Sequence, residues 1–246
     1  MSRPEASKLD VVAFGAHPDD VELACGGTLA LLVERGYRVG IVHLTRGERG
    51  TRGTVAEREA EARAAAAALG VEVVRFLNCV DGGLRTGEAY EDAVIEVIRE
   101  HRPELLFAPP PADRHPDHAR GHRLVAAAAF YAGLARRGQG EPHRPAAVFC
   151  YMEHDLFIPS FIVDVTATWE KKRRALGCYG SQFFQPGAAG RDEPMTKVSS
   201  PEFAAALVGR AQHYGQLIGA AYGEPFWCRQ PLAVGDPMLL LPGGLR

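Results

Sequence analysis

Short apolar runs alternate with segments of helical periodicity along most of the chain. The first run, at 9–15, is rich in β-branched residues and ends at a glycine, which is typical of a strand buried on both faces. The segment after it has apolar residues at helical spacing and ends before Gly36, and this unit then recurs. Strands are expected at 9–15, 38–44, 71–77, 104–108, 146–152, 161–165 and 226–229, and helices at 21–35, 54–69, 88–102, 116–137, 166–176 and 200–219.

Alternating strands and helices imply right-handed crossovers, and hence a parallel sheet covered by helices on both faces. We expect an α/β, doubly wound, Rossmann-like and mainly parallel sheet in which strands numbered along the chain lie in the order 3-2-1-4-5. With 246 residues, 46% of them hydrophobic, the chain can bury one sizeable core. We therefore expect a single domain over 1–246, with a core at about 9–165 and a C-terminal elaboration at about 166–246.

Charge and cysteine content exclude several classes of protein. The chain has 28 Lys and Arg against 30 Asp and Glu, so it lacks the basic surface that nucleic-acid or anionic-membrane binding requires. Its longest apolar run, at 124–135, is too short to cross a bilayer. Five scattered cysteines with no C-x-x-C pair argue against a disulfide framework and a thiolate zinc site. We expect a soluble, cytoplasmic protein with a small-molecule partner.

Two related strings follow the first and fourth expected strands. Residues 15–20 read GAHPDD and residues 113–118 read DRHPDH. The first string replaces the glycine-rich turn of a dinucleotide site, and its adjacent carboxylates would repel a pyrophosphate. Strands 1 and 4 are neighbours at the switch point of the expected sheet, so the two strings should face each other. Their nitrogen and carboxylate donors suit zinc or another divalent first-row metal.

Each residue of these strings also has a plain structural interpretation. Asp19 or Asp20 alone could cap the following helix, and His118 alone could be an ordinary polar helix residue. It is the doubled pattern in this topology that favours a metal site. The remaining histidines lack such a pattern and are interpreted as solvated or packed: His43, His101, His122, His143, His154 and His213.

The paired strings resemble the signatures of the PIG-L/LmbE-like zinc-dependent N-deacetylases, and the Asp113-Arg114 lead-in fits as well. Further motifs are similar to the branch that deacetylates N-acetylglucosaminyl-malate in bacillithiol biosynthesis, so the resemblance covers nearly the whole chain. These motifs lie at 53–54, 58–59, 81–82, 102–103, 169–172, 181–183 and 219–226.

The resemblance implies a role for each residue of the strings. It makes His17, Asp20 and His118 the metal ligands and Asp19 the general base. It makes His115 the stabiliser of the tetrahedral oxyanion, held as an imidazolium by Asp117. The implied cofactor is Zn²⁺, although Fe²⁺ or another divalent metal accepts the same ligands.

Substrate contacts are expected from the loop after the second strand. Arg46, Arg49, Arg52 and Arg58 lie in it or just after it, and arginine suits bidentate capture of the two carboxylates of a malyl group. Arg58 matches a family arginine of the site, and Arg52 is its neighbouring candidate. The alternative is a solvated loop with arginines at background frequency. Glu48, Ser181 and Gln182 are further candidates for contacts to sugar hydroxyls.

The expected function is removal of the N-acetyl group from an anionic N-acetylglucosaminide, with N-acetylglucosaminyl-malate as the specific substrate. The alternatives are an amidase of the same fold acting on a thiol conjugate or a chitooligosaccharide, and a non-catalytic sugar- or nucleotide-binding module. The family resemblance also implies a homo-oligomer, a trimer or hexamer. Phe183, Phe184, Phe226 and Trp227 are expected to be exposed and to supply an interface.

Overall fold

The computed structural model describes residues 8–185 and 193–236. Within these ranges the strands form one seven-stranded sheet of order β3-β2-β1-β4-β5-β7-β6. The pairs among β1 to β5 are parallel, and β7 lies antiparallel to both β5 and β6. The predicted order 3-2-1-4-5 is therefore confirmed, and an antiparallel pair extends it. The strands are β1 (Val11–Gly15), β2 (Val39–His43), β3 (Val73–Phe76), β4 (Leu105–Ala108), β5 (Ala147–Tyr151), β6 (Phe161–Asp164) and β7 (Gly223–Cys228).

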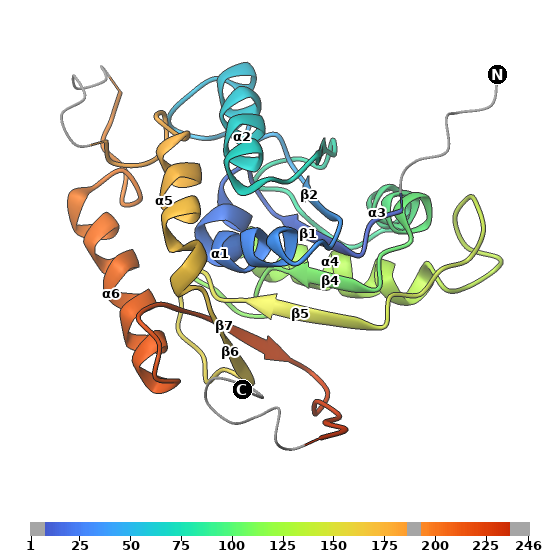
Figure 1. Ribbon diagram of the computed structural model, residues 1–246. Coiled ribbons are helices and arrows are strands. Elements are labelled where there is room, and N and C mark those ends of the chain that lie inside the picture. The colour runs from blue at the N-terminus through green and yellow to red at the C-terminus, as the bar shows by residue number, and fades with distance from the viewer. Residues whose placement is uncertain (1–7, 186–192, 237–246) are drawn as a thin grey trace.

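Helices cover both faces of this sheet (Figure 1). One buried hydrophobic cluster joins one face to α1, α2 and α5, and a second joins the opposite face to α3 and α4. Helix α6 packs along β7 at the antiparallel end. None of these helices is long and apolar enough to span a membrane. Their bounds are α1 (Asp20–Glu34), α2 (Val55–Leu69), α3 (Glu88–His101), α4 (Pro116–Tyr131), α5 (Trp169–Gly177) and α6 (Pro201–Leu217), with a 3₁₀ turn at Thr166–Thr168 before α5.

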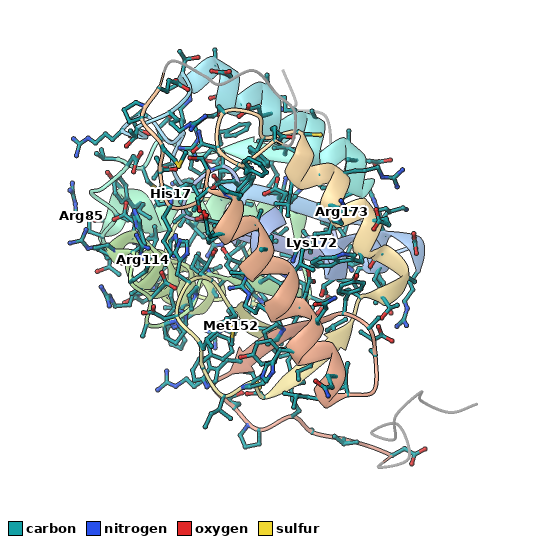
Figure 2. The ribbon with its side chains drawn as sticks, turned by 90° about the vertical axis from the view of Figure 1, so that its left-hand side faces the viewer. His17, Arg85, Arg114, Met152, Lys172 and Arg173 are labelled. Atoms are coloured by element: carbon teal, nitrogen blue, oxygen red, sulfur yellow. The ribbon has the colours of Figure 1, made fainter. Side chains whose placement is uncertain are left out.

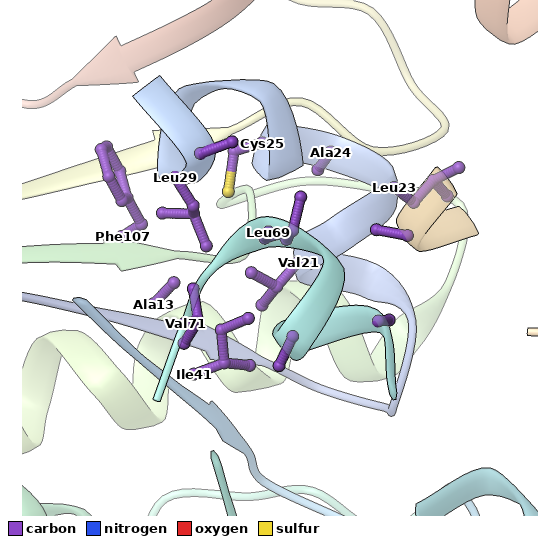
Figure 3. Packing of buried hydrophobic residues seen from close by; sticks show 14 of the residues in the cluster. Ala13, Val21, Leu23, Ala24, Cys25, Leu29, Ile41, Leu69, Val71 and Phe107 are labelled. Atoms are coloured by element: carbon purple, nitrogen blue, oxygen red, sulfur yellow. The ribbon is translucent and has the colours of Figure 1, made fainter. Parts of the chain in front are cut away.

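The first cluster shows why the βαβ units pack as they do (Figure 3). Ala13 and Ile41 are wholly buried on adjacent parallel strands, and Val21 of α1 and Leu69 of α2 are wholly buried above them. Each such large aliphatic side chain contributes about 1.5–3 kcal/mol of stabilisation on burial. The core thereby fixes β1 and the N-terminus of α1, between which the first string lies.

Local sequence signals set the helix ends. Thr54 accepts a hydrogen bond from the Glu57 N–H while Glu57 reaches back to the Thr54 N–H, a capping box at the start of α2. The end of α4 differs from the prediction, because this helix was expected to run to Arg137 and ends at Tyr131. There the Arg99 guanidinium donates to the carbonyls of Ala132 and Leu134, which stabilises a turn in place of another helical turn.

A buried ion pair attaches the C-terminal elaboration to the core. Helix α1 is kinked at Cys25, which leaves the backbone N–H groups at the start of its second half without acceptors within the helix. The Glu224 carboxylate accepts hydrogen bonds from the N–H groups of Gly27 and Thr28 and lies 2.6 Å from Lys172 Nζ. Lys172 belongs to the 169–172 motif and Glu224 to the 219–226 motif, so both motifs have a structural role here.

The expected aromatic interface is only partly exposed. Phe226 is fully buried between Phe107 and Phe161, and Phe183 is 9% exposed beside Tyr179. Only Phe184 is openly exposed among these aromatics, at 39%, and Trp227 is half-buried. The expectation for Phe183 and Phe226 was wrong, because the antiparallel strands and α5 form a core that periodicity did not reveal.

Candidate active site

Two loops meet at the carboxyl ends of β1 and β4, which pair in parallel. The loop after β1 carries His17, and Asp20 is the first residue of α1. The loop after β4 leads to His118 in the first turn of α4. All three side chains are buried although they are polar. The switch point of the sheet thus holds the imidazoles and the carboxylate that the two strings were expected to bring together.

The distances among these three groups suit one shared cation. Nδ1 of His17 lies 3.4 Å from Oδ2 of Asp20, and Nε2 of His118 lies 3.4 Å from Oδ1 of Asp20. Two ligands about 2.1 Å from a tetrahedral ion are themselves about 3.4 Å apart. Asp20 thus lies at ligand spacing from each histidine, through a different oxygen for each, which is compatible with a divalent metal held by His17, Asp20 and His118 and with further positions left for water and substrate.

Other carboxylates support the outer nitrogens of both histidines. Nδ1 of His118 lies 3.0 Å from Oδ1 of Asp113. Nε2 of His17 lies 3.3 Å from Oδ1 of Asp81 and 3.6 Å from Oδ2 of Asp117. A carboxylate on the outer nitrogen orients a metal-binding imidazole and increases its basicity.

The charges of the cluster indicate whether it can accommodate a cation. Burial by itself would lower the pKa of His17 and of His118, yet the neighbouring carboxylates, Asp20 first among them, raise both well above the ordinary value. Burial would likewise raise the pKa of Asp20, but the two histidines hold it well below its usual range. This concentration of buried negative charge is what a divalent cation neutralises, so the residues fit a metal.

Asp19 lies beside this cluster in a strained backbone conformation. Its φ of 118° is in the left-handed region, and its side chain makes no capping hydrogen bond to α1. Burial raises the pKa of Asp19 to about 7, although the Arg58 guanidinium opposes that rise. A carboxylate that titrates near neutral pH is suited to general base catalysis, and strain of this kind concentrates at functional sites. The capping interpretation does not apply to this side chain.

His115 and Asp117 differ from the expected arrangement. Nδ1 of His115 accepts a hydrogen bond from the main-chain N–H of Asp117, while the Asp117 carboxylate faces His17, the Gly82 N–H and Arg120. Burial, followed by repulsion from His17 and His118, lowers the pKa of His115. Asp117 therefore makes no hydrogen bond that would hold His115 as an imidazolium, because its carboxylate contacts His17, Gly82 and Arg120 instead.

A cavity of about 340 Å³ opens over the cluster and is lined by His17, Asp19, Asp20, His115 and His118. Four basic side chains from separate segments complete its wall. Figure 2 shows His17 and Arg114 in the left half of the view and Lys172 and Arg173 in the right half. The basic lining residues are Arg49, Arg58, Arg114 and Lys197.

Comparisons with known proteins agree with this geometry. The family profile described as PIG-L, GlcNAc-PI de-N-acetylase, matches residues 12–129. The diacetylchitobiose deacetylase of Thermococcus kodakarensis is 30% identical over 230 residues, covering 87% of this chain and 80% of the relative. The chain belongs to the PIG-L family. It is a PIG-L deacetylase, a metal-dependent amide hydrolase with a candidate His/Asp metal site.

Two further relatives limit what similarity alone can say about the substrate. The crystal structure of the conserved protein TT1542 from Thermus thermophilus has a TM-score of 0.83 and 36% identity, covering 92% of this chain and 97% of that one. The 4-oxalmesaconate hydratase of Pseudomonas putida is 30% identical, covering 74% of this chain and 76% of the relative. Family membership alone therefore does not name the substrate.

The predicted substrate residues of this PIG-L protein divide into two groups. Arg58 and Gln182 line the cavity. Arg52 instead donates to the Ser181 carbonyl and the Ser199 hydroxyl, and Glu48 accepts from the Asp81 N–H. The Ser181 side chain is buried, and its hydroxyl donates a hydrogen bond to the Glu61 carboxylate. Arg52, Glu48 and Ser181 thus connect the loops around the cavity and do not line it.

Sequence reasoning missed three cavity or cluster residues. His154 was interpreted as solvated or packed, but it lines the cavity and its ring stacks on that of His118 at 5.7 Å. Glu153, its neighbour, is buried within reach of Asp20 and His118. Lys197 comes from a loop far along the chain. The available signal for the first two was their place after β5, the strand next to β4 at the same sheet edge.

Proposed function

We propose that this PIG-L deacetylase hydrolyses the N-acetyl group of an anionic N-acetylglucosaminide. Water adds across the amide bond, so the products are acetate and the free glucosamine amine. The observation that carries the proposal is Asp19, a partly buried carboxylate with a pKa of about 7 beside the candidate metal ligands. A protein that only bound a sugar would have no use for this group.

The chain's own residues account for the proton transfers. A bound metal would supply acidification of water and polarisation of the amide carbonyl. Asp19 takes the proton from the attacking water and later delivers it to the leaving amine. His115 accepts at Nδ1 from the Asp117 N–H, so its proton is on Nε2, from which a neutral imidazole can donate to the oxyanion.

Basic side chains in the cavity support an anionic substrate. Arg49, Arg114 and Lys197 line it, and none of them forms an ion pair with a residue in the described ranges 8–185 and 193–236. Arg58 is different, because its guanidinium already contacts Pro18 and Asp19. Unpaired cations facing one cavity favour a ligand that carries carboxylates.

N-acetylglucosaminyl-malate is the specific substrate that we propose, which would place the protein in bacillithiol biosynthesis. Its sugar carries the acetamide, and its malyl group presents two carboxylates to the three cations. The diacetylchitobiose deacetylase supports a neutral chitooligosaccharide as the competing substrate. The cations favour the malyl glycoside, because chitobiose offers them no charge.

The test measures acetate release by the zinc-loaded protein from N-acetylglucosaminyl-malate, diacetylchitobiose and methyl N-acetylglucosaminide. We expect acetate from all three, with the highest kcat/KM for the malyl glycoside. A preference for diacetylchitobiose would refute the anionic substrate and leave the deacetylase intact. No acetate from any glycoside, together with hydration of an unsaturated dicarboxylate, would refute the proposed function itself.

A further inference from the structure

Glu153 lies at the same sheet edge as the candidate metal ligands. It follows the end of β5, and β5 pairs in parallel with β4, so its loop neighbours the one that carries the second string. Its main-chain carbonyl accepts a hydrogen bond from the Arg210 guanidinium, which fixes the backbone at this point. The side chain is only 1% exposed. Glu153 is therefore buried beside the cluster and does not face solvent.

The Glu153 carboxylate has no partner among the described residues. Neither of its oxygens accepts a hydrogen bond, and it forms no ion pair there, since Arg210 contacts its carbonyl oxygen instead. Buried carboxylates are normally paired, hydrogen-bonded or bound to a metal. The other acids around the cluster follow that rule: Asp113, Asp81 and Asp117 each accept main-chain N–H hydrogen bonds and contact a histidine. Glu153 is the exception among these acids, and a cation beside it would supply the missing partner.

Glu153 lies beside the place where such a cation is expected. A carboxylate oxygen of Glu153, a carboxylate oxygen of Asp20 and a ring nitrogen of His118 all lie within 4.8 Å of one another. Neighbouring ligands of one ion, each about 2.1 Å from it, lie about 3 to 3.4 Å apart. A movement of at most about 2 Å therefore brings Glu153 into the coordination shell that Asp20 and His118 share.

We propose that Glu153 is an additional carboxylate ligand of the metal, joining His17, Asp20 and His118. The proposal rests on the metal site of the proposed function and is independent of which glycoside is the substrate. Two carboxylates and two neutral imidazoles balance the charge of a divalent ion. They also add an oxygen donor, which suits harder ions such as Mn²⁺ or Fe²⁺ better than the three-ligand set does.

The test compares the metal affinity of the full-length wild type with that of Glu153→Gln. Zn²⁺ and Mn²⁺ dissociation constants come from competition with a chromogenic chelator, and the Co²⁺-loaded proteins give an absorption spectrum that reports coordination geometry. We expect Glu153→Gln to weaken Zn²⁺ binding at least about tenfold, to weaken Mn²⁺ binding more, and to shift the Co²⁺ bands. Equal affinities within about twofold and an unchanged Co²⁺ spectrum would overturn the proposal.

Two further variants keep the result interpretable. Glu22→Gln makes the same chemical change at another buried glutamate, whose Oε1 accepts a hydrogen bond from Tyr179, and it should leave both affinity and spectrum unchanged. An equal loss of affinity in Glu22→Gln would also count against Glu153 as a ligand. If Glu153→Gln does not fold, Glu153→Asp retains the charge, and its Co²⁺ bands must still shift because the carboxylate is moved by one methylene.

Discussion

The Arg58 guanidinium lies 3.3 Å from the carboxylate of Asp19 and 2.6 Å from the carbonyl oxygen of Pro18. It thus contacts both the proposed general base and the backbone that precedes it. Arg58 is 4% exposed and also donates to the Gly47 carbonyl. These contacts give it a positioning role at Asp19, in addition to its place in the cavity wall.

Removing Arg58 should move the pH profile of the reaction. Burial raises the pKa of Asp19 to about 7 and Arg58 opposes that rise, so Arg58→Ala should raise the pKa further. A general base must be deprotonated, so the acidic limb of kcat/KM shifts to higher pH and turnover at pH 7 falls about tenfold or more. The loss should be similar for the malyl and the methyl glycoside.

The control for that change is Arg46→Gln, an arginine of the loop before α2 that pairs with Glu59 and lies outside the cavity lining. Its acidic limb should not move. An unshifted limb in Arg58→Ala, with a loss confined to the malyl glycoside, would show instead that Arg58 binds a substrate carboxylate.

Asp19 should affect activity through its carboxylate and stability through its backbone. Asp19→Asn removes the base and should lower kcat by a factor of about 10²–10⁴, without loss of metal binding. Asp19→Ala and Asp19→Gly both remove the carboxylate partner of Arg58, but only glycine relieves the backbone φ of 118°, so Asp19→Gly should be more stable than Asp19→Ala by about 1 kcal/mol. Urea unfolding of the two variants measures this difference, and equal stabilities would refute the strain argument.

Arg114 should determine preference for an anionic aglycone. It lines the cavity, is exposed, and has no acidic partner among the described residues. Charged hydrogen bonds contribute about 1.5–3 kcal/mol, so Arg114→Ala should raise KM for N-acetylglucosaminyl-malate by about tenfold or more. KM for methyl N-acetylglucosaminide should stay the same. Arg85→Ala, an exposed arginine over Tyr90, is the control, and equal effects of Arg114→Ala on both substrates would contradict the assignment.

The Lys172–Glu224 pair should govern stability. Both side chains are 2% exposed, and Lys172→Met would leave the Glu224 carboxylate buried without its cation. Breaking one partner of a buried pair costs about 3–5 kcal/mol, which chemical denaturation would detect. Lys171→Met removes an exposed pair with Glu34 and should cost less than about 1 kcal/mol. Similar losses in the two variants would contradict the structural role of the contact between Glu224 and the kink of α1.

Much of the fold followed from local patterns. Apolar runs such as 9–15 can form little other than buried strands, and the parallel order then places the ends of β1 and β4 side by side. That adjacency predicted that the two strings face each other, as they do in the structure, while the choice of His17, Asp20 and His118 among their residues came from the family resemblance. These features depend on short stretches of sequence and on topology, both of which a single chain reveals.

The remainder depended on long-range contacts that no local pattern encodes. Ser181 donates hydrogen bonds to Glu61, which is 120 residues away in the sequence. Arg52 donates to the Ser181 carbonyl across a separation of 129 residues. Their side chains looked available for substrate because their partners could not be seen. His154 and Glu153 were missed for the converse reason, since their strand gave no sign of the metal cluster until β5 was placed beside β4.

The most direct test of the central claim measures acetate release from N-acetylglucosaminyl-malate by metal-loaded wild type, by the same protein after chelation and zinc restoration, and by Asp19→Asn with its zinc content determined. We predict acetate and glucosaminyl-malate in equal amounts from the wild type, loss on chelation, recovery with zinc, and release slowed by a factor of about 10²–10⁴ in a zinc-replete Asp19→Asn. Acetate release that survives chelation, or full turnover by Asp19→Asn, would contradict the account.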